Sequence, residues 1–82
     1  MNQIALLGAG SWGTALAIVL ADNGHHVKIW ARRNEQVDEI NNQHTNEKYL
    51  PNIALQETIE ASSDTSHVID GADTIVVVIP TK

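Results

Sequence analysis

The stretch Gly8-Ala9-Gly10-Ser11-Trp12-Gly13 follows the apolar segment Ile4-Ala5-Leu6-Leu7 and leads directly into Thr14-Ala15-Leu16-Ala17-Ile18-Val19-Leu20. A glycine-rich turn that joins an apolar strand to an apolar helix is typical of a dinucleotide phosphate site. In such a turn Gly8 permits the tight reversal, Gly10 lets a pyrophosphate approach the main chain, and Gly13 lets the helix pack closely on the sheet. The first helical turn adds free N–H groups and a dipole that favours an anion. An ordinary loop is the alternative, and the flanking strand and helix favour the phosphate site.

The composition is that of one small globular domain. The 82 residues are 43% hydrophobic and 18% charged, and the only aromatic side chains are Trp12, Trp30 and Tyr49, so aliphatic residues must form the core. The formal net charge of −5 argues against nucleic acid or a membrane surface as a partner. The longest apolar run, residues 15–21, is too short for a bilayer span, which needs about 20 residues. Because nothing at the start reads as a targeting signal, we expect a cytoplasmic protein.

Metal and thiol chemistry are not indicated. The sequence has no cysteine, so it holds no disulfide, thiolate metal site or redox dithiol. Four histidines are present without the helical spacing of metal ligands: His25, His26, His44 and His67. We therefore predict no metal site.

The hydrophobic pattern predicts alternating strands and helices. Four segments have the pattern of strands: residues 3–7, 26–30, 59–62 and 74–79, the last closed by Pro80. Three have the pattern of helices: residues 11–22, a weaker helix that carries Glu35, Val37 and Ile40, and a brief one capped by Ser63 or Asp64 that ends at Gly71. A surface loop is predicted at residues 41–52.

This order predicts an α/β fold with a Rossmann-like, doubly wound parallel sheet. Successive strands joined by helices pair in parallel through right-handed crossovers, and the fourth strand lies on the other side of the first, which gives the spatial order 3-2-1-4. The last strand is apolar on both faces and the sequence ends three residues after it. We therefore interpret residues 1–82 as a truncated amino-terminal part of a dinucleotide-binding domain, without a substrate domain. Its uncovered apolar strand predicts self-association.

The end of the second strand predicts which dinucleotide is bound. In an NAD site a carboxylate about 20 residues after the glycines binds the ribose hydroxyls. Here Arg32 and Arg33 stand in its place, which suits the 2′-phosphate of NADP. A charge-assisted bond from each arginine should favour NADP over NAD by about tenfold or more. Because arginine also stacks on adenine, we expect some NAD binding to survive. The alternative interpretation of the two arginines is that they belong to an ordinary solvent-exposed turn.

Two aromatic residues have two interpretations each. The helical position of Trp12 suits a core residue packed on Leu16, but its place at the mouth of the glycine turn also suits a wall for the dinucleotide. Tyr49 is either a packing residue beside Leu50 and Pro51 or a phenol that reaches over the cofactor from the loop.

Four segments resemble the NAD(P)-dependent glycerol-3-phosphate dehydrogenases of bacterial type. They run the length of the chain: Gly8-Ala9-Gly10-Ser11-Trp12-Gly13-Thr14-Ala15-Leu16-Ala17, Trp30-Ala31-Arg32-Arg33, Asn46-Glu47-Lys48-Tyr49-Leu50-Pro51 and Val76-Val77-Val78-Ile79-Pro80-Thr81. One departure is Gln56, where members often have a second proline.

The resemblance implies reduction of dihydroxyacetone phosphate to sn-glycerol 3-phosphate by NAD(P)H, for phospholipid synthesis. It implies that Ser11 and Trp12 contact the cofactor, that Arg32 and Arg33 hold the adenosine ribose, and that Tyr49 lies near the adenine. Members carry their catalytic lysine and substrate residues after the fourth strand and in a helical carboxyl-terminal domain. No catalytic residue is therefore expected in this chain, Lys82 included, and we expect the chain alone to be inactive.

Two rival interpretations differ in substrate and in class. The first is another reductase with the same half-domain, such as a hydroxyacid or ketopantoate-type enzyme. The second is a stand-alone nucleotide-sensing module without catalysis. Trp12 and the Tyr49-Leu50-Pro51 loop argue against the first, and the apolar last strand argues against the second.

Overall fold

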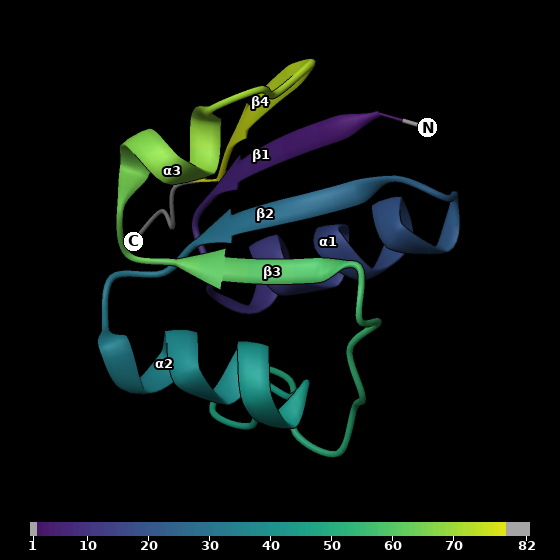
Figure 1. The fold of residues 1–82 in the computed structure, drawn as a ribbon. Coiled ribbons are helices and arrows are strands. Elements are labelled where there is room, and N and C mark those ends of the chain that lie inside the picture. The colour runs from purple at the N-terminus through teal and green to yellow at the C-terminus, as the bar shows by residue number, and fades with distance from the viewer. Residues whose placement is uncertain (1, 79–82) are drawn as a thin grey trace.

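A computed structural model describes residues 2–78, which form one parallel sheet with helices on both faces (Figure 1). The sheet has four strands: β1 (Gln3–Leu7), β2 (His26–Trp30), β3 (Ile59–Ser62) and β4 (Thr74–Val77). Their order is β3-β2-β1-β4, and all three pairings are parallel. The predicted fold class and strand order are confirmed. The predicted last strand continues to Ile79, which with Pro80 lies outside the described residues.

The helices form the crossovers between these strands. They are α1 (Ser11–Asp22), α2 (Asn34–Asp38) with the π-helical turn η1 (Glu39–Gln43), and α3 (Thr65–Ile69). In Figure 1 α1 lies behind the sheet and α3 lies in front of it. Asp64, and not Ser63, caps α3, because its carboxylate accepts a hydrogen bond from the Ser66 N–H at 3.0 Å.

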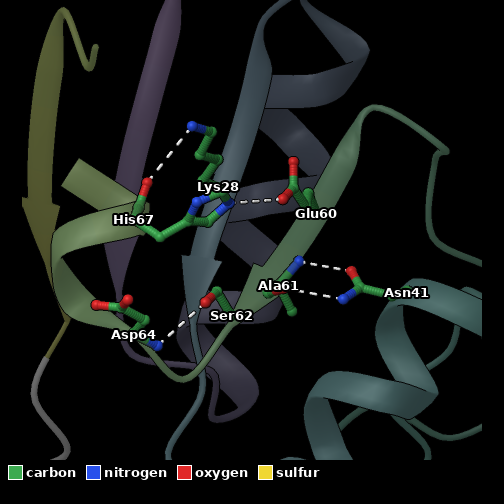
Figure 2. A network of polar contacts seen from close by, with 7 residues as sticks. All are labelled: Lys28, Asn41, Glu60, Ala61, Ser62, Asp64 and His67. Carbon is green, nitrogen blue, oxygen red and sulfur yellow. Dashed lines mark hydrogen bonds and ion pairs between the residues drawn. The ribbon is translucent and has the colours of Figure 1, made fainter. Parts of the chain in front are cut away.

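The core lies mainly between the sheet and the layer formed by α1 and η1. Alternate residues of β2, Val27 and Ile29, are buried in this layer with Ala17 of α1 and Ile40 of η1. The opposite face of β2 is polar at Lys28, whose ammonium group donates to the His67 carbonyl of α3 at 3.4 Å (Figure 2). β2 therefore has one buried apolar face and one polar face.

The predicted surface loop begins too early in the chain. Residues 41–43 belong to η1, which extends the helix begun by α2. The polar run Asn41-Asn42-Gln43 is typical of a loop, but the side chain of Asn41 makes two hydrogen bonds to the main chain of β3. The helix ends at His44, which has a left-handed backbone with φ 56°.

Asn41 covers the outer edge of β3. Its amide nitrogen donates to the Ala61 carbonyl at 2.9 Å, and its amide oxygen accepts from the Ala61 N–H at 2.7 Å (Figure 2). The side chain thus makes the two hydrogen bonds that a further strand would make at this residue. A second amide, Gln56, ties the loop before β3 to the Ile18 carbonyl of α1 at 3.1 Å.

The outer strand β4 is only half covered. Ile75 and Val77 are 52% and 57% exposed, whereas Val76 packs against the core. Within residues 2–78, no helix is long and apolar enough to cross a membrane.

We expect Asn41→Ala to lower the free energy of unfolding by about 1–2 kcal/mol, because both main-chain groups of Ala61 lose their partner. Urea denaturation measures this change. The matched control is Asn42→Ala, since Asn42 is an exposed neighbour on the same turn. Equal stability of the two variants would show that the edge of β3 does not need Asn41.

Candidate cofactor site

A cleft opens where the chain leaves the carboxyl ends of β1 and β2. Parallel pairing aligns Leu7 of β1 with Trp30 of β2, so the segments that follow both strands meet at one edge of the sheet. The cleft has a volume of about 990 Å³. This is near the upper end of the range of about 300–1,000 Å³ that ligand pockets occupy. Among the described residues 2–78, eleven line it: Gly8, Ala9, Gly10, Ser11, Trp12, Gly13, Trp30, Arg32, Gln36, Tyr49 and Val78.

The three glycines of the turn have different surroundings. A Cβ on Gly13 would collide with the Gly8 carbonyl oxygen, so Gly13 is where α1 packs against the turn. Gly8 has φ +135°, and a Cβ there would collide with the Val78 carbonyl oxygen beyond β4. A Cβ on Gly10 would meet nothing within 4 Å. The space in front of Gly10 therefore belongs to the cleft, as expected where a pyrophosphate approaches the main chain.

The amino-terminal end of α1 is not compensated within this helix. Gly10 is the cap residue and has no side chain to accept a bond from the first turn, and that turn carries no acidic residue. The partial positive charge of the helix end and its free N–H groups therefore face the cleft. This arrangement favours an anion, and a phosphate group is the common occupant of such a position.

A buried network holds the inner side of the same turn. The Ala9 carbonyl oxygen accepts from the Gln36 side-chain amide at 2.7 Å and from the Asn46 side-chain amide at 3.0 Å. The Thr14 hydroxyl donates to the Gly10 carbonyl at 2.8 Å and accepts from Asn46 at 2.8 Å. The side chains come from α1, α2 and the loop after η1, so the network joins three segments under the turn. Asn46 and Thr14 are each 1% exposed and Gln36 is 9% exposed.

The aromatic residues lie around the mouth of the cleft. Trp12 is 82% exposed, so its interpretation as a core residue is wrong and only the wall of the cleft remains. Tyr49 is half-buried and lines the cleft, and its carbonyl accepts from the Ser11 hydroxyl at 3.1 Å. Trp30 ends β2, with its indole N–H donating to the Ser63 carbonyl at 3.0 Å.

The two arginines are placed differently. Both arginines are exposed, but Arg32 lines the cleft whereas Arg33 does not belong to the described lining. Arg33 has an extended backbone, with φ −105° and ψ 138°, and its carbonyl accepts from Gln36 and Val37 at the start of α2.

Comparison with known proteins identifies the family. Residues 3–82 match the family described as NAD-dependent glycerol-3-phosphate dehydrogenase N-terminus. This chain belongs to that family. The resemblance drawn from the sequence is confirmed.

Individual members of the glycerol-3-phosphate dehydrogenase family are similar over the whole chain. All 82 residues align with 56% identity to a glycerol-3-phosphate dehydrogenase (NAD(P)+) of Geobacillus kaustophilus, of which they span 24%. The crystal structure of glycerol-3-phosphate dehydrogenase from Coxiella burnetii has a TM-score of 0.88 and 44% identity over 96% of this chain and 24% of that one. The enzyme of Plasmodium falciparum has a TM-score of 0.86 and 38% identity over 96% of this chain and 25% of that one. The chain thus spans about a quarter of these relatives.

Seven of the eight site residues predicted from the sequence line the cleft, and Arg33 is the eighth. The sequence reasoning missed Gln36 and Asn46, although Asn46 begins a segment that resembles the glycerol-3-phosphate dehydrogenase family. A buried amide in a polar segment has no periodic pattern that would reveal it. Trp30 was also missed, and its position at the carboxyl end of a strand was the available clue.

We expect Gly13→Ala and Gly10→Ala to differ sharply in stability. Gly13→Ala should cost about 2–3 kcal/mol because the added Cβ meets main chain that has little room to move. Gly10→Ala should cost less than about 1 kcal/mol, since Gly10 has φ −78° and open space at its Cβ position. Thermal denaturation of both variants compares them, and similar losses would contradict the packing role of Gly13.

Proposed function

We propose that this chain is the NAD(P)H-binding part of a glycerol-3-phosphate dehydrogenase that reduces dihydroxyacetone phosphate to sn-glycerol 3-phosphate. The observation that carries the proposal is the open space at Gly10 in front of the uncompensated end of α1. Open main chain at a helix amino terminus suits an anion, and a pyrophosphate is the anion expected after a glycine-rich strand-to-helix turn. The family match supplies the substrate, since members carry the name glycerol-3-phosphate dehydrogenase.

Each part of the dinucleotide has a partner of suitable chemistry in the cleft. The main chain at Gly8, Gly10 and Ser11, with Gly13 behind it, suits the pyrophosphate. Arg32 lies after β2, where the adenosine ribose arrives in this fold, and its guanidinium suits a 2′-phosphate. The rings of Trp12 and Tyr49 offer flat apolar walls at the mouth.

Catalysis is assigned to residues outside these 82. The reduced nicotinamide supplies a hydride for the carbonyl carbon of the substrate when it is bound. The oxygen of that carbonyl needs a proton donor in the transition state. The described lining of the cleft contains no lysine, histidine or carboxylate that would serve. We therefore propose that this chain binds and orients the cofactor and has no turnover alone.

We expect Arg32→Ala to lower the affinity for NADPH by about tenfold or more, because only NADPH has the 2′-phosphate that Arg32 would bind. The affinity for NADH should stay within about threefold of the wild-type value. Calorimetric titration with both nucleotides measures this difference. Arg33→Ala is the matched control and should change NADPH binding less, since Arg33 does not line the cleft. If the wild-type protein binds neither nucleotide, the proposed function is wrong; if it binds both equally, only the preference is wrong.

We also propose that the 82-residue chain self-associates through β4, where Ile75 and Val77 expose apolar side chains on an outer strand. Sedimentation velocity should show dimers or larger species as the concentration rises. Val77→Thr should reduce them, whereas Ile69→Thr on α3 should not, although Ile69 is also 39% exposed. A wild-type chain that stays monomeric at high concentration would contradict the proposal.

A cytoplasmic location is likewise proposed and fits a chain without cysteine.

A further inference from the structure

We infer that Asn46 and Gln36 are positioning residues for the cofactor pyrophosphate, which they orient without binding it, by fixing the peptide between Ala9 and Gly10. The inference rests on the proposed function of the cleft. Its basis is the pair of side-chain amides that donate to the Ala9 carbonyl from the protein interior, at 2.7 Å from Gln36 and 3.0 Å from Asn46.

The geometry of the peptide carries the argument. The described chain has no cis peptide bond, so the carbonyl of Ala9 and the N–H of Gly10 point in opposite directions. The carbonyl is directed inward by the two buried amides and by the Thr14 hydroxyl, which donates to it at 3.3 Å, and the N–H is therefore directed outward into the cleft. Among residues 2–78, no hydrogen bond has the Gly10 N–H as its donor. The amides hold this group in place for an anion.

The next peptide is fixed in the same way and by the same network. The Gly10 carbonyl accepts from the Thr14 N–H at 2.9 Å and from the Thr14 hydroxyl at 2.8 Å. This carbonyl points along α1, so the N–H of Ser11 points out of the helix start toward the cleft. Asn46 donates to the same hydroxyl at 2.8 Å, so the hydroxyl proton is directed to main chain, with the Gly10 carbonyl at 2.8 Å closer than the Ala9 carbonyl at 3.3 Å. Two successive N–H groups are thereby oriented together, as in the main-chain concavities that bind phosphate.

Neutral donors are required at these two positions. The Gln36 amide also donates to the Asn46 amide oxygen at 3.2 Å, so each side chain holds the other in the orientation that presents N–H to Ala9. A carboxylate at residue 46 would keep the shape of the side chain and remove both N–H donors. Its charge would repel the Ala9 carbonyl and the cofactor anion alike. The buried position of Asn46, at 1% exposure, leaves no water to screen that repulsion.

The test uses the full-length protein that the gene encodes and three ligands titrated by calorimetry. NADPH carries both kinds of phosphate, ADP carries the pyrophosphate without the 2′-phosphate, and adenosine 2′-monophosphate carries only the 2′-phosphate. We expect Asn46→Asp to lower the affinities for NADPH and ADP by roughly tenfold or more, and Gln36→Met to lower them by roughly fivefold. The reason is that main-chain N–H groups without a fixed orientation bind the pyrophosphate more weakly. Both variants should bind adenosine 2′-monophosphate within twofold of wild type.

The matched control is Asn41→Asp. Asn41 also makes two hydrogen bonds to main chain, but at the edge of β3 and not in the cleft. This variant should lose stability and bind all three ligands within twofold of wild type. It separates a loss of stability from a loss of orientation.

Folded variants that bind NADPH and ADP as tightly as wild type would overturn the inference, and so would variants that weaken all three ligands equally. If Asn46→Asp does not fold, Gln36→Met decides by the same criteria. If the wild-type protein binds NADPH and the variants bind it with the same affinity, only this inference is refuted. A wild-type protein that binds neither NADPH nor ADP refutes the proposed function, and the inference falls with it.

Discussion

The inward hydrogen bonds of the Ala9 carbonyl are the constraint on which the cofactor site depends. A carbonyl in a turn between two glycines would normally be free to rotate with them. Here Gln36 and Asn46 hold it from segments that lie 27 and 37 residues further along the chain. The glycine turn therefore has a defined shape only after α2 and the loop that follows η1 have packed under it. Local sequence makes the turn possible, and tertiary contacts select one conformation.

The parallel sheet brings the rest of the site to this turn. Parallel pairing of β1 with β2 places Arg32 near the glycines, and pairing of β1 with β4 places the Val78 carbonyl against Gly8. The same register explains why Gly8 tolerates no side chain, since the chain leaving β4 passes directly over it. The two outer strands of the sheet differ in how they are covered. The outer edge of β3 is closed by the side chain of Asn41, whereas β4 leaves the apolar side chains of Ile75 and Val77 exposed.

Most of the fold follows from local patterns. The apolar run of β1, the helical spacing of α1 and the glycines between them predict their bounds and the strand order, because these features report burial directly. The cofactor cleft follows from the same motif, and Arg32 follows from its place after β2.

Other features depend on contacts between distant residues and leave no pattern in the sequence. Residues 41–43 are helical and Asn41 bonds to β3, which the polar run Asn41-Asn42-Gln43 does not indicate, and the exposure of Trp12 is not indicated by its helical spacing. The sequence gives no reason to distinguish Arg32 from Arg33. They differ in the structure, where Arg33 caps α2 and only Arg32 belongs to the described lining of the cleft. The buried amides were not predictable for the same reason.

A crystal structure of the full-length protein with NADPH would show whether the peptide between Ala9 and Gly10 presents its N–H to the pyrophosphate. We expect a pyrophosphate oxygen within hydrogen-bond distance of the Gly10 N–H, with the Ala9 carbonyl still directed to Gln36 and Asn46. A bound cofactor with the peptide between Ala9 and Gly10 reversed would contradict it. So would a pyrophosphate held by side chains away from the start of α1.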